Sequence, residues 1–188
     1  MVEASAPRKA PTTVAAWIAF GSNVGDRLSH LRFALTSLKQ AAGIDLDVAS
    51  DVASVYETTP VDCAIPQGDF LNTVCRVKTS LAAAELLSTL HAVESERERR
   101  RPATNAPRTL DLDLLALGTL VRHEPALMIP HPRMSCRLFV LEPLCELEPA
   151  WMHPVTGTPI HQLLDSARAA HADQGISVFA DRSWPVAV

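Results

Sequence analysis

The sequence predicts an α+β domain in which helices pack on an antiparallel sheet. Short apolar runs of strand length alternate with segments whose leucines recur at helical intervals, and turn-forming residues separate them. Taken in order, these segments are strand, helix, strand, strand, helix and strand. This β-α-β-β-α-β order is that of ferredoxin-like folds, whose helices lie on one face of the sheet. A length of 188 residues, 47% of them hydrophobic, fits a single domain with additions at its ends.

The first half of the chain is expected to supply a strand, a helix and a second strand. Residues 14–20 are an apolar run of strand length, followed by turn-forming residues. A helix should run from Asp26 to a stop near Gly43, because leucines recur there at intervals of three and four residues. Residues 44–57 mix β-branched residues with alternation and are expected to form a strand. The two prolines and the glycine within 58–68 predict a loop.

The second half begins with another strand–helix–strand unit. Residues 70–77 form an apolar strand pattern, and Ser80 is placed to cap a helix over 81–96. An arginine-rich loop follows, and residues 110–117 are expected to return as a strand.

Prolines break up the next stretch, which leaves room for a short helix at 135–141. Residues 160–170 have helical spacing, and the tail from Gly175 is left unassigned. We therefore expect one domain over 14–165, a loose lead-in over 1–13 and a C-terminal extension over 166–188. The extension has no expected role.

Composition and charge restrict the class of partner. No apolar run approaches the roughly 18 residues of a membrane span, and no secretory leader is recognisable, so we expect a cytoplasmic protein that contacts no membrane. The net charge of −4 gives no footprint for nucleic acid. Positive charge is local, with five arginines between positions 97 and 108. Such a cluster suits a small polyanion, and we expect a monomer that binds small molecules.

Two aspartates in the last predicted strand are the strongest chemical signal. Side chains two residues apart in a strand share a face, so Asp111 and Asp113 point away from the neighbouring leucines. Their Cα atoms should lie about 6.6 Å apart. Like charges at that separation need a cation, and oxygen ligands suit Mg²⁺ completed by water and substrate phosphate. Arg108 adds a planar phosphate donor beside them. Alone, the pattern also fits a solvated edge strand.

The neighbouring motifs make the pattern recognisable. In order and spacing, the chain resembles the 6-hydroxymethyl-7,8-dihydropterin pyrophosphokinase family of folate biosynthesis over residues 14–164. The segments that carry the resemblance are Phe70-Leu71-Asn72, Glu94, Arg99-x-Arg101-Pro102, Pro107-Arg108-Thr109-Leu110-Asp111-Leu112-Asp113, Pro130-His131 and Arg137-x-Phe139.

The resemblance implies transfer of the β,γ-pyrophosphoryl group of ATP to the hydroxymethyl oxygen of a reduced pterin, with release of AMP. It implies two Mg²⁺ ions held by Asp111 and Asp113. Arg99 and Arg101 match arginines of a loop that closes over ATP, and Arg108 matches an arginine beside the metals. Positioning and charge stabilisation would then carry most of the catalysis.

The same resemblance assigns the two substrates to further residues. Phe70 and Phe139 match aromatics that sandwich the pterin, Asn72 matches the amide that reads its edge, and Thr58 and Val61 match positions whose backbone does the same. His131 and Arg137 match ATP contacts, as do the positions of His91 and Glu94. Departures from the family pattern are His91 in place of a glutamine, Pro132 in place of an aromatic, and a loop before Pro107 that lacks the usual tryptophan and is one residue shorter than in some relatives.

Other classes are less consistent with these residues. A different metal-dependent nucleotidyl, phosphoryl or glycosyl transferase would use the two aspartates but not the set Phe70, Asn72 and Phe139. A ferredoxin-like nucleic-acid-binding module needs a basic sheet face. Here that face carries carboxylates, which repel phosphate unless a metal is bound. A catalytically inactive relative would not need to retain Arg99 and Arg108 together with both aspartates.

Overall fold

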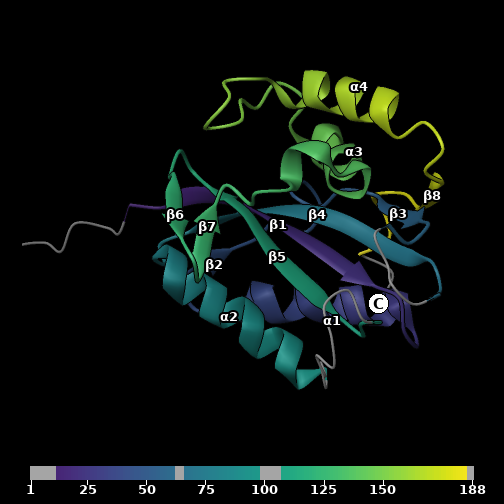
Figure 1. Cartoon of the computed structure of the whole chain (residues 1–188). Coiled ribbons are helices and arrows are strands. Elements are labelled where there is room, and N and C mark those ends of the chain that lie inside the picture. The colour runs from purple at the N-terminus through teal and green to yellow at the C-terminus, as the bar shows by residue number, and fades with distance from the viewer. Residues whose placement is uncertain (1–11, 62–65, 98–106, 186–188) are drawn as a thin grey trace, which may run out of the picture.

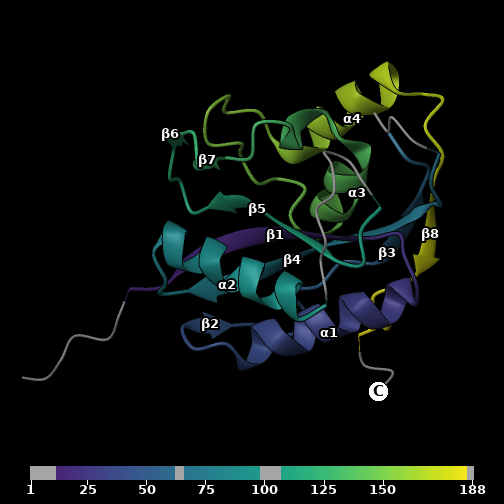
Figure 2. The same cartoon turned by 60° about the horizontal axis from the view of Figure 1, so that its bottom comes forward.

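A mixed architecture with an antiparallel sheet is confirmed. The computed structural model describes residues 12–61, 66–97 and 107–185. Within these ranges, an antiparallel sheet lies between two layers of helices (Figures 1 and 2). The expectation of helices on one face only is wrong, because the C-terminal third of the chain adds a second helical layer.

Each helical layer covers its own hydrophobic core. Helices α1 (Arg27–Gln40) and α2 (Ala83–Glu96) pack on one face of the sheet, against buried residues such as Ile18. Helices α3 (Leu138–Leu147) and α4 (Ile160–Ala170) pack on the opposite face. None of the described helices is long and apolar enough to cross a membrane.

The main sheet contains strands from every part of the chain, in the order β5-β1-β4-β3-β8, with β2 paired to β4, and each of these pairs is antiparallel. The bounds are β1 (Val14–Ser22), β2 (Ile44–Asp45), β3 (Val55–Thr58), β4 (Phe70–Thr79), β5 (Asp111–Leu117) and β8 (Ile176–Ala180). Strands β5 and β8 are therefore its two edges.

The single strand expected over 44–57 is wrong, because a turn divides it into β2 and β3. The Asp47 side chain accepts hydrogen bonds from the Ala49 N–H (3.1 Å) and the Ser50 hydroxyl (2.9 Å). An aspartate that bonds to its own neighbouring backbone offers the chain a turn in place of a sheet ladder. The alternation of apolar residues across 44–57 did not show that a turn at Asp47 would replace the strand there.

The N-terminal caps of α1 and α2 differ in how well the sequence predicts them. The Asp26 side chain accepts from the Ser29 N–H at 3.1 Å, as its place before α1 predicts. Helix α2 begins at Ala83, so Ser80 is not its cap; the Glu85 carboxylate instead accepts from the Ala82 N–H at 2.8 Å. The observed α4 has the predicted bounds.

The region after β5 is more ordered than its prolines suggested. A hairpin of β6 (Arg122–Glu124) and β7 (Leu127–Ile129) precedes a short 3₁₀ turn and α3. The helix expected at 135–141 begins later and runs on past Pro143. Pro143 lacks the N–H that would bond back to the Phe139 carbonyl, yet it lies inside α3 with its ring buried.

The unassigned C-terminal tail is part of the same sheet. Strand β8 pairs with β3, and Trp184 beyond it is 3% exposed. The Trp184 indole donates to the Ala53 carbonyl at 2.9 Å, and its own carbonyl accepts two hydrogen bonds from Arg32 on α1. The tail thus closes one end of the core beside α1.

We predict that Trp184→Ala lowers the free energy of unfolding by about 3–5 kcal/mol, because it empties a buried aromatic site and removes one of the two hydrogen bonds to the Ala53 carbonyl, the other being donated by Thr73. Urea denaturation followed by circular dichroism measures the change. The matched control is Phe179→Ala on β8, whose side chain is 47% exposed and should matter little. Equal effects of the two substitutions would contradict the packing role of Trp184.

Candidate active site

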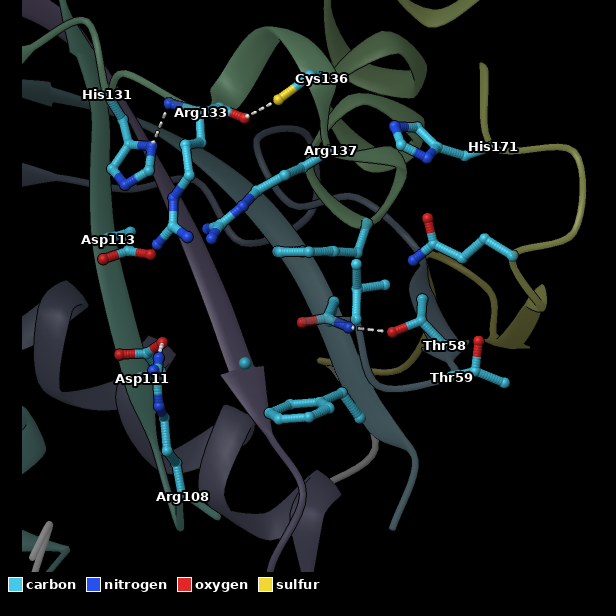
Figure 3. A pocket seen from close by; sticks show the side chains of 16 residues that line it. Thr58, Thr59, Arg108, Asp111, Asp113, His131, Arg133, Cys136, Arg137 and His171 are labelled. Carbon is cyan, nitrogen blue, oxygen red and sulfur yellow. Dashed lines mark hydrogen bonds and ion pairs between the residues drawn. The ribbon is translucent and has the colours of Figure 1, made fainter. Parts of the chain in front are cut away.

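A cavity of about 430 Å³ opens on the sheet face that carries α3 and α4. Its walls come from β5, β1, β4 and β3, from the segments before and at the start of α3, and from the residues that follow α4 (Figure 3). Segments far apart in sequence therefore meet around one volume, which is large enough for small ligands.

Strand β5 presents two carboxylates to this cavity. Leu110, Leu112 and Leu114 are buried in the core beneath α1 and α2, and Asp111 and Asp113 project from the opposite face. The predicted alternation is therefore present. Because one face of β5 is committed to the core, the register of the aspartates cannot slip without exposing leucine.

The sheet register places the aspartates in line with the residues at the other end of the cavity. Gly21 on β1 pairs with Asp111 on one side and with Asn72 on the other. With a strand spacing of about 4.8 Å, Asp111 and Asn72 are about 10 Å apart across β1. A Cβ on Gly21 would lie 3.2 Å from the Asn72 side-chain oxygen. The glycine thus leaves open the space between the two ends.

Burial makes the aspartate pair unfavourable without a cation. Desolvation and the neighbouring Asp111 charge raise the pKa of Asp113 above the ordinary aspartate value. Arg108 forms an ion pair with Asp111, which offsets part of the repulsion. No cluster of three or more His, Cys, Asp or Glu side chains suited to a metal occurs among the described residues. Two hard oxygen donors without a complete cage suit Mg²⁺, whose remaining ligands are water and substrate phosphate.

Arg108 is held by the end of β1. The Arg108 N–H donates to the Asn23 side chain at 2.7 Å, and the Asn23 N–H donates to the Arg108 carbonyl at 3.0 Å. The Ser22 hydroxyl donates to the Thr109 carbonyl at 2.6 Å. The end of β1 and the turn that follows it therefore fix the backbone that leads into the aspartate strand.

Cationic and imidazole groups face the aspartates from the other wall (Figure 3). The His131 Nδ1 atom accepts from the Arg133 N–H at 3.2 Å, so the neutral ring carries its proton on Nε2. Burial lowers the pKa of His131, although Asp113 opposes this shift. Burial, followed by the charge of Arg133, lowers the pKa of Arg137. These groups form a donor-rich wall suited to phosphate oxygens.

The far end of the cavity carries aromatic and amide groups. The buried Asn72 side chain donates to the Thr58 hydroxyl at 2.8 Å, which fixes the orientation of its amide. Phe70, at the start of β4, and Phe139, at the start of α3, line the same volume, and the Arg137 guanidinium lies 5.2 Å from the Phe139 ring centre. Apolar faces beside a fixed amide suit a flat heterocycle with polar edges.

The structure brings together most of the residues that the sequence singled out. The cavity is lined by the predicted residues Thr58, Val61, Phe70, Asn72, Arg108, Asp111, Asp113, His131, Arg137 and Phe139. Arg99 and Arg101 lie outside the described residues. His91 is exposed on α2 and does not line the cavity.

Sequence reasoning did not assign six further lining residues to the site, which are Gly21, Thr59, Arg133, Cys136, His171 and Gln174. A glycine facing the cavity between Asn72 and Asp111 is detectable only once the strand register is known. His171 and Gln174 lie between the predicted helix over 160–170 and the unassigned tail, where the pattern predicted no element.

Glu94 does not line the cavity and instead lies under strand β5. Its side chain is buried, and its carboxylate accepts from the Leu112 N–H at 2.8 Å. Leu112 stands between the two aspartates on β5, an edge strand, so no neighbouring strand among the described residues pairs with this N–H. Glu94 therefore fixes the backbone that carries both carboxylates, in a place where we expected an ATP contact.

The comparison with protein families decides between the classes left open by the sequence. Residues 17–149 match the family described as 7,8-dihydro-6-hydroxymethylpterin-pyrophosphokinase (HPPK). The chain belongs to the HPPK family. It is therefore an ATP-dependent pyrophosphokinase that transfers the pyrophosphoryl group of ATP to hydroxymethyldihydropterin in folate synthesis. A different nucleotidyl or phosphoryl transferase is not favoured.

Individual HPPK relatives agree over most of the chain. It is 39% identical over 169 residues to the 2-amino-4-hydroxy-6-hydroxymethyldihydropteridine pyrophosphokinase of Bacillus subtilis, covering 89% of this chain and 92% of that protein. It is 36% identical over 170 residues to the enzyme of the same name from Synechocystis sp., covering 90% and 79%. The match to the folic acid synthesis protein fol1 of Schizosaccharomyces pombe is 34% identical over 165 residues, covering 88% of this chain but 21% of that protein.

Solved structures agree with the fold. The HPPK-DHPS protein of Plasmodium falciparum, in a structure described as containing SDX-DHP, superposes with a TM-score of 0.68 at 13% identity. The match covers 86% of this chain and 46% of that one, so the chain spans less than half of the two-part protein. At this identity the likeness concerns the fold alone.

We predict that Glu94→Leu lowers the free energy of unfolding by about 1–3 kcal/mol, because the buried Leu112 N–H loses its acceptor. Glu94→Gln, which keeps an acceptor oxygen, should retain most of the stability and serves as the conservative control. Chemical denaturation measures both. A leucine variant as stable as the parent would contradict the role of Glu94 in holding β5.

We predict that Asp113→Asn raises the free energy of unfolding at neutral pH in magnesium-free buffer. A carboxyl whose pKa is raised in the folded state costs stability wherever it is ionised. That cost disappears as the pH falls through the raised pKa toward the ordinary aspartate value, so the advantage of the asparagine variant should shrink as the pH is lowered from neutral. Denaturation at several pH values measures it, with exposed Asp165→Asn as the control. A variant that is less stable than the parent at pH 8 would contradict the electrostatic account.

Proposed function

We propose that the cavity is the active site for this transfer, with ATP at the aspartate end and the pterin at the Asn72 end. The observation that carries the proposal is the cross-strand row from Asp111 through Gly21 to Asn72, which lies on one sheet face and within one cavity. For direct transfer, both substrates must lie in one cavity with the acceptor hydroxyl aimed at the reacting phosphate, and residues placed along this row would hold them in that orientation.

At the phosphate end, Asp111 and Asp113 would hold two Mg²⁺ ions, whose chemistry is to neutralise polyphosphate charge and lower the pKa of the acceptor hydroxyl. Arg108, Arg137 and His131 Nε2–H donate to phosphate oxygens from the surrounding walls. Arg99 and Arg101, which match the family loop, are proposed to complete the set.

At the acceptor end, the pterin lies between Phe70 and Phe139, and Asn72 bonds to its polar edge. Thr58 holds the Asn72 amide in place, and backbone groups at Thr58 and Val61 serve the same edge. The hydroxymethyl group then points along the row toward the aspartates, in the direction from which the pyrophosphoryl group comes. Cavity walls that exclude water strengthen each of these electrostatic contacts.

The remaining proposals concern organisation. The strand order β5-β1-β4-β3, with α1 and α2 on one face, supports a ferredoxin-like arrangement for the domain over 14–165. We propose that the protein acts as a cytoplasmic monomer without nucleic acid, the lead-in over 1–13 and the extension over 166–188 being additions to that domain.

The function is tested by incubating the protein with ATP, Mg²⁺ and 6-hydroxymethyl-7,8-dihydropterin and separating AMP from ADP. We predict AMP formation that requires the pterin, and a loss of at least about a hundredfold in Asp113→Ala, because the metal site loses half of its protein ligands. Asp165→Ala on α4 is the matched control and should behave as the parent. ADP as the product, or normal AMP formation by Asp113→Ala, would contradict the proposal.

A further inference from the structure

The residues that follow α4 form part of the cavity wall at the acceptor end. The Thr59 N–H donates to the Gly175 carbonyl at 3.0 Å, and Ile176 at the start of β8 pairs with Thr58. The backbone at 174–175 is therefore fixed beside the strand that orients Asn72. His171 and Gln174 line the same cavity, and in Figure 3 His171 lies on the side of Thr58 and Thr59, away from Asp111 and Asp113.

The Gln174 amide has an unused donor in this wall. Its Nε2 atom is buried and has no hydrogen-bond partner among the described residues. A buried donor without an acceptor is destabilising, and such groups are uncommon in folded proteins. The backbone on both sides is held, by the bond of the Gln174 N–H to the His171 carbonyl (3.0 Å) and by the bond to Gly175. The backbone that carries this side chain is therefore held at the cavity, while the amide donor lacks a partner among the described residues.

We propose that Gln174 is a specificity residue of the acceptor site, whose Nε2–H donates to an acceptor atom on the polar edge of the bound heterocycle. This rests on the proposed placement of the pterin at the Asn72 end. The pterin edge carries ring nitrogens and a carbonyl oxygen that need donors, and one of the two N–H groups of the Asn72 amide is already used by Thr58. Gln174 precedes β8, and the aspartates lie on β5 at the opposite edge of the sheet. Its donor should therefore act on the pterin and not on ATP.

Gln174→Ala tests the proposal in the full-length protein. The Kd and KM for the pterin should rise about three- to tenfold, the effect of one neutral hydrogen bond, while the KM for ATP and kcat stay within about twofold. Gln174→Glu, which replaces the donor with an acceptor, should weaken pterin binding at least as much. Gln162→Ala, an exposed glutamine on α4, is the matched control and should change neither constant.

A second readout separates recognition from a structural role. Because Gln174→Ala removes an unpartnered buried donor, the ligand-free variant should melt at the same temperature as the parent or higher. A lower melting temperature, or pterin binding equal to that of the parent, would overturn the proposal. If the parent protein itself binds no pterin, the proposed function fails and this inference fails with it. If the parent binds pterin and Gln174→Ala binds it equally well, only this inference fails.

Discussion

The site depends on the way in which strand β5 is held at the edge of the sheet. One face of β5 is buried against α1 and α2, one backbone edge pairs with β1, and the Leu112 N–H on the other edge bonds to Glu94. The strand can therefore neither slip in register nor twist freely. Both carboxylates have one place to project, and the cross-strand row from Asp111 to Asn72 follows from that constraint.

The sequence patterns that predicted the structure best were those compatible with only one arrangement of the backbone. Alternation at 110–114 predicted both faces of β5 correctly, because a buried leucine row leaves no other register. The spacing in α4 predicted its bounds for a similar reason. Residues 44–57 were misread because the alternation around Asp47 resembles a strand until its side chain is seen to bond to the following backbone. Strand β8 could not be predicted from its own residues, because most of them are exposed and the strand is positioned by its pairing with β3.

Similar reasons explain what could be predicted of the site. Aspartates and aromatics within recognisable motifs could be named, and the cavity brings them together. The functions of Gly21, Glu94 and Gln174 depend on contacts between distant segments, which no local pattern contains. Glu94 shows this most clearly, since the family resemblance placed it among the ATP contacts. Its buried carboxylate instead bonds to the backbone of β5.

Two features of the cavity are unfavourable in the ligand-free protein and are spatially separate. The Asp111–Asp113 pair brings two carboxylates together at one end, where Arg108 offsets part of their repulsion, and Gln174 holds an unused donor at the other. A bound ligand can remove each unfavourable feature. Cations would neutralise the carboxylate pair, and an acceptor atom on the edge of a heterocycle would pair with the Gln174 donor. The cavity thus has two chemically distinct ends, which matches a reaction between a metal-bound polyphosphate and a flat acceptor.

The central claim is that the two carboxylates of β5 form the metal site, and anomalous diffraction tests it most directly. Crystals grown with Mn²⁺, which shares the oxygen-ligand preference of Mg²⁺, a non-hydrolysable ATP analogue and the pterin would locate each ion. The account predicts two anomalous peaks within bonding distance of Asp111 and Asp113, between them and the polyphosphate. Bound nucleotide whose metal ions contact neither carboxylate would contradict it.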